Sequence, residues 1–476
     1  MNSQWNIPAV EKKGLRASRY RLVLFLLFGA VLVWGVLTRT LVAYLAETKP
    51  ELALRLRPNS SAALVQLAEQ ELHLATAPKP TDLSADPRQS SVPNLEPTLE
   101  KQEKSPGQRS KIPSFYPIGL GNKSATRIKA WTKLAIRDDP LNARAFGMLA
   151  RVSDIGTDKD QTRRLMQAAV RRSLHETLAV SWMMLMSYQN EDYHAALSYA
   201  DVLLRTNPGF LSAAMPILGS IAETKNPELK KLLATNPPWR PEFLKLLPAY
   251  ITDARTPLEI LLSLKNSGTS PTTADLESYL DFLVRHGFYD LAYYTWLQFL
   301  PAAQLSRAGR LFNGSFEGEP SGQPFDWVLS KGAGYTTKIA ARRDANDARA
   351  LFIQLGPGRV DFGGVQQLII LPPGNYRLEG QYKSDLVSDR GLYWQIGCAN
   401  GNKALGESEP FNGTSHDWKH FAVTFAVPDT ECPAQYVMLV SGARSASEQF
   451  LSGTVWYDDL RIDEGAREAA HDLPAR

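Results

Sequence analysis

The most regular hydrophobic pattern in the chain lies near its N-terminus. From Leu22 to Thr38 the sequence reads LVLFLLFGAVLVWGVLT, 17 residues without a charge. This length is near the minimum for a helix that crosses a bilayer. The helix can continue through LVAYLA because Arg39 can extend its side chain to the membrane interface. The pattern therefore predicts a transmembrane helix over residues 22–46.

Basic residues set the predicted orientation of this helix. Those that precede it are Lys12, Lys13, Arg16, Arg19 and Arg21, and those that follow are Arg39 and Lys49. Under the positive-inside rule, residues 1–21 form a cytoplasmic tail and the rest of the chain lies outside, in the periplasm of a bacterium. A cleavable signal peptide is the alternative, but the basic region is long and no A-x-A site closely follows the apolar run. We predict a single-pass protein of the inner (cytoplasmic) membrane.

Helical and linker patterns alternate after this span. Residues 47–75 place leucine and alanine at near-helical spacing, with a break at Pro58-Asn59, and predict membrane-proximal helices. Residues 76–117 are rich in Pro, Ser, Lys and Glu and poor in large apolar side chains. They cannot bury enough surface to offset their ordering entropy, so a flexible linker is expected. Helical patterns return over residues 118–310.

One helical stretch, NEDYHAALSYADVLLRTNPG, resembles the second half of a tetratricopeptide repeat. Ala196 lies 12 residues before Pro208, as the small packing residue and terminal proline of that repeat do. Asp139-Pro140 lies 68 residues, or two 34-residue periods, upstream of Asn207-Pro208. The resemblance implies stacked helix pairs over residues 118–310, whose groove docks a partner protein. Helices that serve only as a spacer are the alternative.

From residue 311 onward the pattern is that of β-strands. Short alternating runs such as NYRLEGQY, GLYWQIGC and HFAVTFAV are separated by Gly, Pro, Asn and Asp. Such strands, with no helices between them, predict an antiparallel β-sandwich over residues 311–465. A disordered tail is expected over residues 466–476. The predicted fold class is therefore a multidomain α + all-β protein, with a transmembrane helix, a helical repeat region and a sandwich.

Five stretches follow one another along the sandwich region in this order: NGSFE, FDWVLS, LPPGNYRLEGQY, HDWKHFAVTFAVP and GTVWYDDLRI. This order resembles the jelly-roll carbohydrate-binding modules and their galactose-binding-like relatives. The resemblance implies that the first and last strands are neighbours, with a structural calcium between them held by Glu317, Asp458 and Asp459. Calcium prefers such hard oxygen ligands. A solvated acidic edge, or Asp458 accepting hydrogen bonds from backbone amides, is the alternative.

The same resemblance implies a sugar-binding face. Such modules stack aromatic rings on sugar faces and place polar side chains at the sugar's edges. The candidates are Trp327, Arg377, Gln381, Tyr393, Gln395 and Trp418. In GLYWQI, Tyr393 and Gln395 share one face of the strand, whereas Trp394 lies among aliphatic neighbours and is expected in the core. Arg377, Glu379 and Gln381 alternate similarly on NYRLEGQY. A plainly solvated sheet is the alternative.

Charge and cysteine content narrow the setting. The formal net charge is only +4, with no long basic run, so we expect no binding to nucleic acid. Cys398 and Cys432 are the two cysteines. In an oxidising compartment they can form a disulfide, and two buried free thiols are the alternative.

Motifs of catalysis are scarce in the sequence. It contains no G-x-S-x-G elbow, Walker loop or HExxH motif, and nothing isolates a carboxylate pair for glycoside hydrolysis. We therefore expect no enzyme and, apart from calcium, no cofactor. The combination of parts suggests, by analogy, a periplasmic scaffold for assembly or export of a cell-surface polysaccharide. One alternative is a protein-interaction scaffold that binds no glycan, and another is a glycan-active enzyme or accessory subunit.

Overall fold

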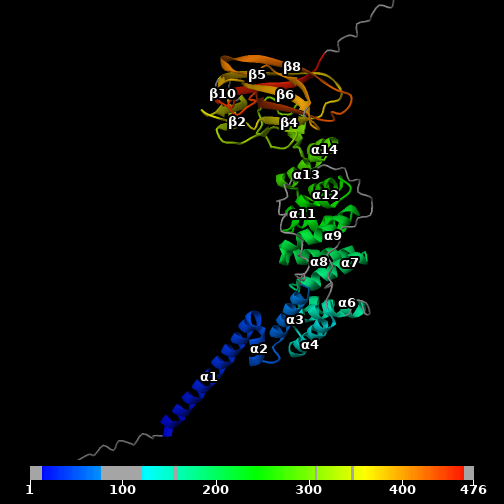
Figure 1. Ribbon diagram of the computed structural model, residues 1–476, viewed down its shortest axis with the longest axis vertical. Helices are drawn as coiled ribbons and strands as arrows, with labels where there is room; N and C mark the ends of the chain where they lie inside the picture. The colour runs from blue at the N-terminus through cyan, green and yellow to red at the C-terminus, as the bar shows by residue number, and fades with distance from the viewer. Residues whose placement is uncertain are drawn as a thin grey trace, which may run out of the picture. The chain divides into compact units, whose positions relative to one another are not determined.

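The computed structural model of the chain (Figure 1) describes residues 13–76, 121–153, 159–305, 308–342, 344, 348–401 and 403–465. The chain divides into two compact units, Met1–Arg240 and Pro241–Arg476. The predicted tail 466–476 and nearly all of the predicted linker 76–117 lie outside the described residues.

The first unit begins with a long apolar helix, α1 (Lys13–Thr48), drawn in blue in Figure 1. Its portion Leu26–Thr48 is long and apolar enough to cross a membrane. Large apolar side chains on it, such as Phe28 and Trp34, are exposed, a surface that suits lipid rather than water. A signal sequence meets the same criterion of length and composition.

Short helices follow in the described part of this unit, several of them in contacting pairs such as α3–α4, α5–α6 and α7–α8. They are α2 (Pro50–Leu56), α3 (Ser61–Thr76), α4 (Asn122–Asp138), α5 (Ala143–Val152), α6 (Lys159–Arg172), α7 (Thr177–Gln189), α8 (Tyr193–Thr206), η2 (Pro208–Phe210), α9 (Leu211–Glu223) and α10 (Pro227–Ala234). Helices α5, α7 and α9 begin at residues 143, 177 and 211, and α6, α8 and α10 at 159, 193 and 227. Each series therefore advances by 34 residues, a regularity typical of a helical repeat.

Local sequence explains the pair α7–α8. Asp192 ends the turn between the two helices and accepts a hydrogen bond from the backbone N–H of Ala195 at 3.0 Å, so it satisfies one of the free donors at the start of α8. Ala196 and Ala200 follow at helical spacing and are fully buried. Their small side chains allow α7 and α8 to pack closely.

The helices on the two sides of residues 77–120 belong to one compact unit. Ala68 and Leu72 of α3 share one core with Ile128 of α4 and Met148 of α5. The membrane-proximal helices therefore belong to the same unit as the helical pairs.

The unit Pro241–Arg476 contains helices as well as the sandwich: α12 (Thr256–Asn266), α13 (Thr273–Arg285), α14 (Tyr289–Phe299) and α15 (Ala302–Leu305), preceded by α11 (Arg240–Leu246) and η3 (Leu247–Tyr250). Tyr293 of α14 packs edge-on against Phe325, with ring centroids 5.1 Å apart, and Trp296 does the same with Phe312 at 5.1 Å. These aromatic contacts pack α14 against the segment that leads into the sandwich, within the compact unit Pro241–Arg476.

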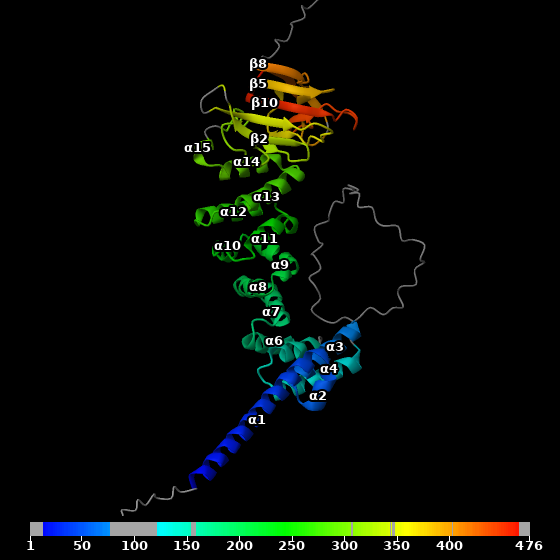
Figure 2. The same cartoon turned by 90° about the vertical axis from the view of Figure 1, so that its left-hand side faces the viewer.

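The sandwich is antiparallel, as the strand pattern predicted. Its strands are β1 (Val328–Leu329), β2 (Tyr335–Ala341), β3 (Arg349–Leu355), β4 (Val365–Ile369), β5 (Gly374–Ser388), β6 (Leu392–Cys398), β7 (Ala404–Glu407), β8 (Gly413–Val427), β9 (Gln435–Ser441) and β10 (Leu451–Glu464). One sheet has the order β1-β4-β9-β6-β7 and the other β2-β3-β10-β5-β8. Figure 2 shows β8, β5, β10 and β2 of the second sheet together. Strand alternation places one apolar row of each sheet between the two sheets.

Aromatic side chains fill the core between the sheets. Trp327, Trp394 and Tyr457 are fully buried, and their rings meet edge-on, Trp327 with Trp394 at 5.7 Å and Trp394 with Tyr457 at 5.4 Å. The prediction that Trp394 belongs to the core is confirmed.

The segment NGSFE meets the last strand, as the resemblance implied. The backbone N–H of Leu460 on β10 donates to the carbonyl of Gly314 at 2.9 Å. A Cβ on Gly314 would lie only 1.9 Å from the carbonyl oxygen of Leu460. Only glycine permits this approach, so the motif ties the start of the sandwich to its end.

Candidate functional site

A cleft of about 350 Å³ lies on the outer face of the sheet β2-β3-β10-β5-β8. We call it the polar cleft, because its side chains are mostly hydrogen-bonding groups. They are Arg377, Glu379 and Gln381 from β5, His420 from β8, and Asp459 and Arg461 from β10. Two sequence candidates for sugar binding, Arg377 and Gln381, are therefore brought together here.

Strand register explains why these side chains converge. Gln381 pairs with His420 on β8 and with Asp458 on β10, while Glu379 pairs with Arg461. Three residue steps on β10 match two on β5 between these pairs, which is a β-bulge. Asp459 takes a left-handed backbone conformation in it, with φ 51°. The bulge places Asp459 at the cleft and keeps Arg461 on the outward face.

Charges in the polar cleft are largely paired with one another. Glu379 forms an ion pair with Arg377 at 2.7 Å and accepts a hydrogen bond from Arg461 at 2.5 Å. Arg461 also bonds Asp463 at 3.1 Å, and this bond is the main cause of the raised pKa of Arg461. The side chain of Arg461 is 62% exposed, so water screens these pairs and each adds little to stability.

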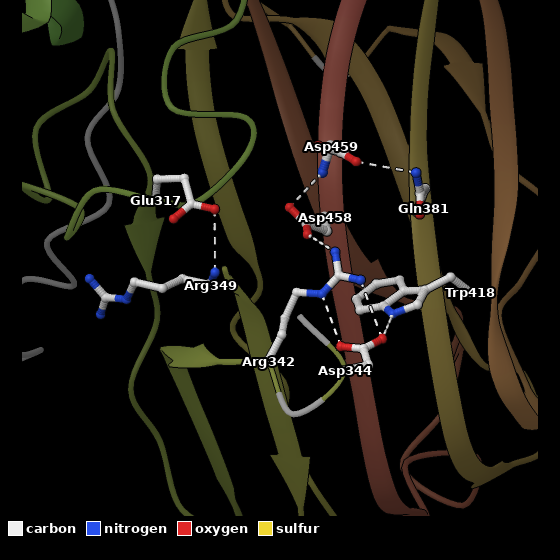
Figure 3. Close-up of polar contacts among 8 residues, drawn as sticks. All are labelled: Glu317, Arg342, Asp344, Arg349, Gln381, Trp418, Asp458 and Asp459. Atoms are coloured by element: carbon white, nitrogen blue, oxygen red, sulfur yellow. Dashed lines mark hydrogen bonds and ion pairs between the residues drawn. The ribbon is translucent and has the colours of Figure 1, made fainter. Parts of the chain in front are cut away.

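A group of contacts that we call the arginine clasp lies beside the cleft (Figure 3). Arg342, just after β2, donates from Nη1 to Asp458 Oδ2 at 2.6 Å. Its Nε and Nη2 donate to the two oxygens of Asp344 at 3.2 and 3.3 Å. Its guanidinium lies 4.3 Å from the ring centroid of Trp418, whose indole N–H donates to Asp344 at 2.5 Å. Asp458 is only 3% exposed under these groups.

The ionisation of the clasp reflects both burial and pairing. The hydrogen bond from Arg342 is the main reason why the pKa of Asp344 falls to about 2. Burial raises the pKa of Asp458 despite the neighbouring guanidinium, while the bond to Asp344 is the main cause of the raised pKa of Arg342.

An aromatic pair on the same face was missed by the sequence reasoning. Trp456 of β10 packs on Phe352 of β3 with ring centroids 4.5 Å apart, and both are partly exposed. Trp456 lies two residues before Asp458, which is about 7 Å along a strand. The alternation in GTVWYDDLRI could have placed Trp456 on the face of Asp458, but only the sheet order shows that this face also carries Gln381.

The structure removes Trp327 from the sugar-binding candidates. This side chain is 0% exposed, and its indole N–H donates to the carbonyl of Asn313 at 2.9 Å. Neither face of its ring can reach a sugar. Trp418 lies at the second sheet, but Arg342 covers one face of its ring.

The remaining candidates lie on the opposite sheet. Tyr393 and Gln395 share a face of β6, as predicted, but β6 belongs to the sheet β1-β4-β9-β6-β7. Gln395 donates to Glu407 at 2.6 Å. The core separates this face from Arg377 and Gln381, so the predicted polar side chains do not form one ligand face.

The carboxylates of the expected calcium site have other partners. Asp458 is paired with Arg342, Asp459 accepts from Gln381 at 3.2 Å, and Glu317 accepts from the backbone N–H of Arg349 at 3.3 Å. Figure 3 shows Glu317 apart from the two aspartates. In the described part of the chain, no group of three His, Cys, Asp or Glu side chains is placed to hold a metal ion.

The two cysteines are joined. Cys398 at the end of β6 and Cys432 before β9 form a disulfide with Cα atoms 5.2 Å apart, which decides between the two states that the sequence left open.

Comparisons with known proteins place solved carbohydrate-binding modules among the structures similar to this chain. A family 4 module is 16% identical, with a TM-score of 0.25, over 33% of this chain and 99% of its own. The CBM22-1 xylan-binding domain of Paenibacillus barcinonensis Xyn10C is 14% identical, with a TM-score of 0.22, over 32% and 91%. A β-1,3-glucan-binding CBM6 of Bacillus halodurans is 16% identical, with a TM-score of 0.19, over 28% and 94%.

No protein-family model matches the sequence, and no curated protein matches it. At these identities and TM-scores, function has to be argued from the chain's own residues.

Proposed function

We propose that this protein is a non-enzymatic, membrane-anchored scaffold whose sandwich binds a glycan in the polar cleft. The observation that carries the proposal is the convergence of six polar side chains from β5, β8 and β10 on one outward face, with the partly exposed Trp456 on the same face. Amide, carboxylate, imidazole and guanidinium groups match the hydroxyls of a sugar, which both donate and accept hydrogen bonds.

Charge pairing in the cleft favours a ligand of low net charge. Glu379 is paired with both Arg377 and Arg461, and Arg461 is also paired with Asp463, so each of the two guanidiniums in the cleft has a carboxylate partner. A polysaccharide can add hydrogen bonds to such groups without breaking the ion pairs. Trp456 adds an apolar ring surface of the kind that stacks on a pyranose.

The same pairing argues against catalysis in the cleft. A glycosidase needs one carboxyl group that holds a proton and a second that is free to attack or to activate water. Glu379 is bonded by two guanidiniums and Asp459 by an amide. Neither carboxylate is placed to act as a general acid, so a binding role fits better than a hydrolytic one.

The helical pairs would dock a protein partner. The 34-residue advance of successive helices supports tetratricopeptide-like repeats, which stack because no single pair can bury both its faces. The apolar helix α1 supports the membrane anchor. The disulfide between Cys398 and Cys432 suits an oxidising compartment such as the periplasm.

These parts together support a place in the assembly or export of a cell-surface polysaccharide. An anchored helical scaffold would hold a partner of the machinery, and the sandwich would contact the emerging glycan. This step rests on the combination of parts by analogy, and it depends on glycan binding by the sandwich.

Affinity electrophoresis of the detergent-solubilised full chain tests the glycan site. Soluble xylan, β-1,3-glucan and β-1,4-galactan serve as a first panel. Gln381→Ala should weaken binding about threefold to tenfold, because it removes a neutral hydrogen-bonding group. Tyr393→Ala on the opposite sheet is the matched control and should leave binding unchanged.

The outcomes separate the candidate functions. Weaker binding in Tyr393→Ala with an unchanged Gln381→Ala would move the site to the other sheet. Absence of binding across a wide glycan panel would favour the alternative, a protein-interaction scaffold that binds no glycan.

A further inference from the structure

Asp458, one of the three carboxylates that were expected to hold a calcium ion, is paired with an arginine instead. Calcium needs six to eight oxygen ligands, several of them carboxylates. Glu317 instead accepts from the backbone of Arg349, and Asp458 is paired with Arg342. Asp459 is drawn into the polar cleft. In the arrangement seen, these carboxylates do not fit a calcium ion.

Arg342 meets the requirements of a resident cation. All three of its guanidinium nitrogens donate to carboxylates, one to Asp458 and two to Asp344. Its flat face covers the ring of Trp418 at 4.3 Å, a favourable cation–π geometry. The side chain of Arg342 is 16% exposed and that of Asp458 5%, so water screens this pair far less than the pairs of the cleft.

These contacts span the whole sheet. Arg342 follows β2 at one edge, Asp458 lies on the central strand β10, and Trp418 lies on β8 at the other edge. Asp458 points outward like its register partner Gln381, yet it is buried. The cover comes from the clasp itself, which crosses the outer face as Figure 3 shows.

The clasp also reaches the polar cleft through consecutive hydrogen bonds. Asp458 Oδ1 accepts from the backbone N–H of Asp459 at 2.8 Å, within the bulge where Asp459 has φ 51°. Asp459 Oδ2 in turn accepts from Nε2 of Gln381 at 3.2 Å. The position of Asp458 therefore bears on two side chains that line the cleft.

We propose that the guanidinium of Arg342 acts in this sandwich as the structural cation in place of a metal ion, and that by fixing Asp458 it positions Asp459 and Gln381 in the polar cleft. The second part rests on the proposed glycan site, whereas the first does not. Arg342 is a positioning residue, since it does not itself line the cleft.

Thermal unfolding of the detergent-solubilised full chain tests the first part. Arg342→Met should lower the Tm of the sandwich by roughly 5–15 °C, because it leaves Asp458 buried without its cation. Arg342→Lys should recover part of this loss, since lysine restores the positive charge but not the planar guanidinium that donates to two carboxylates at once. Arg390→Met is the matched control, because it breaks an ion pair between Arg390 and Glu448 that is 3.0 Å long. The side chain of Arg390 is 46% exposed, so this substitution should shift the Tm little.

Two further experiments show whether Arg342 stabilises the sandwich through its charge or only through packing of its side chain. The double variant Arg342→Met, Asp458→Asn should melt above Arg342→Met alone, because the uncompensated carboxylate is gone. Neither calcium chloride nor EGTA should move the Tm of the unsubstituted protein. A fall in Tm with EGTA that calcium reverses, or an Arg342→Met variant as stable as the Arg390→Met control, would overturn the proposal.

Affinity electrophoresis with the panel of xylan, β-1,3-glucan and β-1,4-galactan tests the positioning role of Arg342. It is run at a temperature below the Tm of the unsubstituted protein and of the Arg342→Met variant. Arg342→Met should weaken binding of whichever of these the unsubstituted chain retains, and Arg342→Lys should partly restore it. Unchanged binding in Arg342→Met would refute the positioning role. If the unsubstituted chain binds no glycan, the proposed glycan site fails and the positioning role with it, while the thermal results still decide the role of Arg342 as a cation.

Discussion

Replacement of Gly314 by alanine should loosen the sandwich at the point where its first segment meets its last strand. The added Cβ would lie 1.9 Å from the carbonyl oxygen of Leu460, whereas ordinary contact begins near 3.4 Å. The backbone must therefore move by about 1.5 Å, which is large for a packed interior. The carbonyl of Leu460 belongs to the main chain, so it cannot relieve the contact by rotating as a flexible side chain could.

The expected cost has two parts. Overpacking of this kind costs about 1–3 kcal/mol, and the movement would weaken the hydrogen bond from Leu460 to Gly314, now 2.9 Å long, at about 1 kcal/mol. The sum of about 2–4 kcal/mol corresponds to a fall in Tm of roughly 4–16 °C for a unit the size of Pro241–Arg476.

The assay is near-ultraviolet circular dichroism of the full chain during heating, since Trp327 and Trp394 are buried in the core of the sandwich and contribute to this signal. Gly401→Ala is the control, because nothing lies within 4 Å of its Cβ position. If the Gly314→Ala protein has the same Tm as the Gly401→Ala control, the close approach of Gly314 to the carbonyl of Leu460 is refuted. The pairing of NGSFE with GTVWYDDLRI is then refuted as well.

Two further predictions concern covalent and charge stabilisation. Reduction of the Cys398–Cys432 disulfide, which closes a separation of 34 residues, should cost about 4 kcal/mol in the chain-entropy account; an unchanged Tm in the presence of dithiothreitol, after thiol labelling confirms reduction, would contradict this. The pKa of Asp344 is lowered from 3.8 to about 2, so its carboxylate favours the folded state above pH 4 and this contribution is lost as pH falls from about 4 to 2. The difference in Tm between the unsubstituted protein and Asp344→Asn should therefore shrink over that interval, and a constant difference would show that ionisation of Asp344 plays no part.

The fold could be predicted from the sequence where the pattern is local. Alternation in GLYWQI placed Trp394 inward and Tyr393 outward, and both lie so in the structure. The charge-free run near the N-terminus indicated an apolar helix, and the proline spacing indicated a 34-residue period. These signals are local because a side chain's direction depends on its own strand or helix.

The candidate site was predicted only in part, for reasons that are also physical. Arg377 and Gln381 lie four residues apart on β5, so strand alternation alone predicts that their side chains share one face of the sheet. That Tyr393 lies on the other sheet could not be predicted, because alternation does not say which sheet a strand joins. The burial of Trp327, which was a sugar-binding candidate, could not be predicted, since an isolated aromatic in a short segment carries no periodic signal.

Sequence by itself thus determined which side chains of each strand point together, where strands and helices alternate, and that an apolar helix precedes them. Tertiary structure alone decided that Arg342 meets Asp458, 116 residues away. It also decided that a bulge turns the adjacent Asp459 into the polar cleft. Contacts of this kind depend on strand order and register, which are set by packing of the whole sandwich and leave no periodic trace in the local sequence.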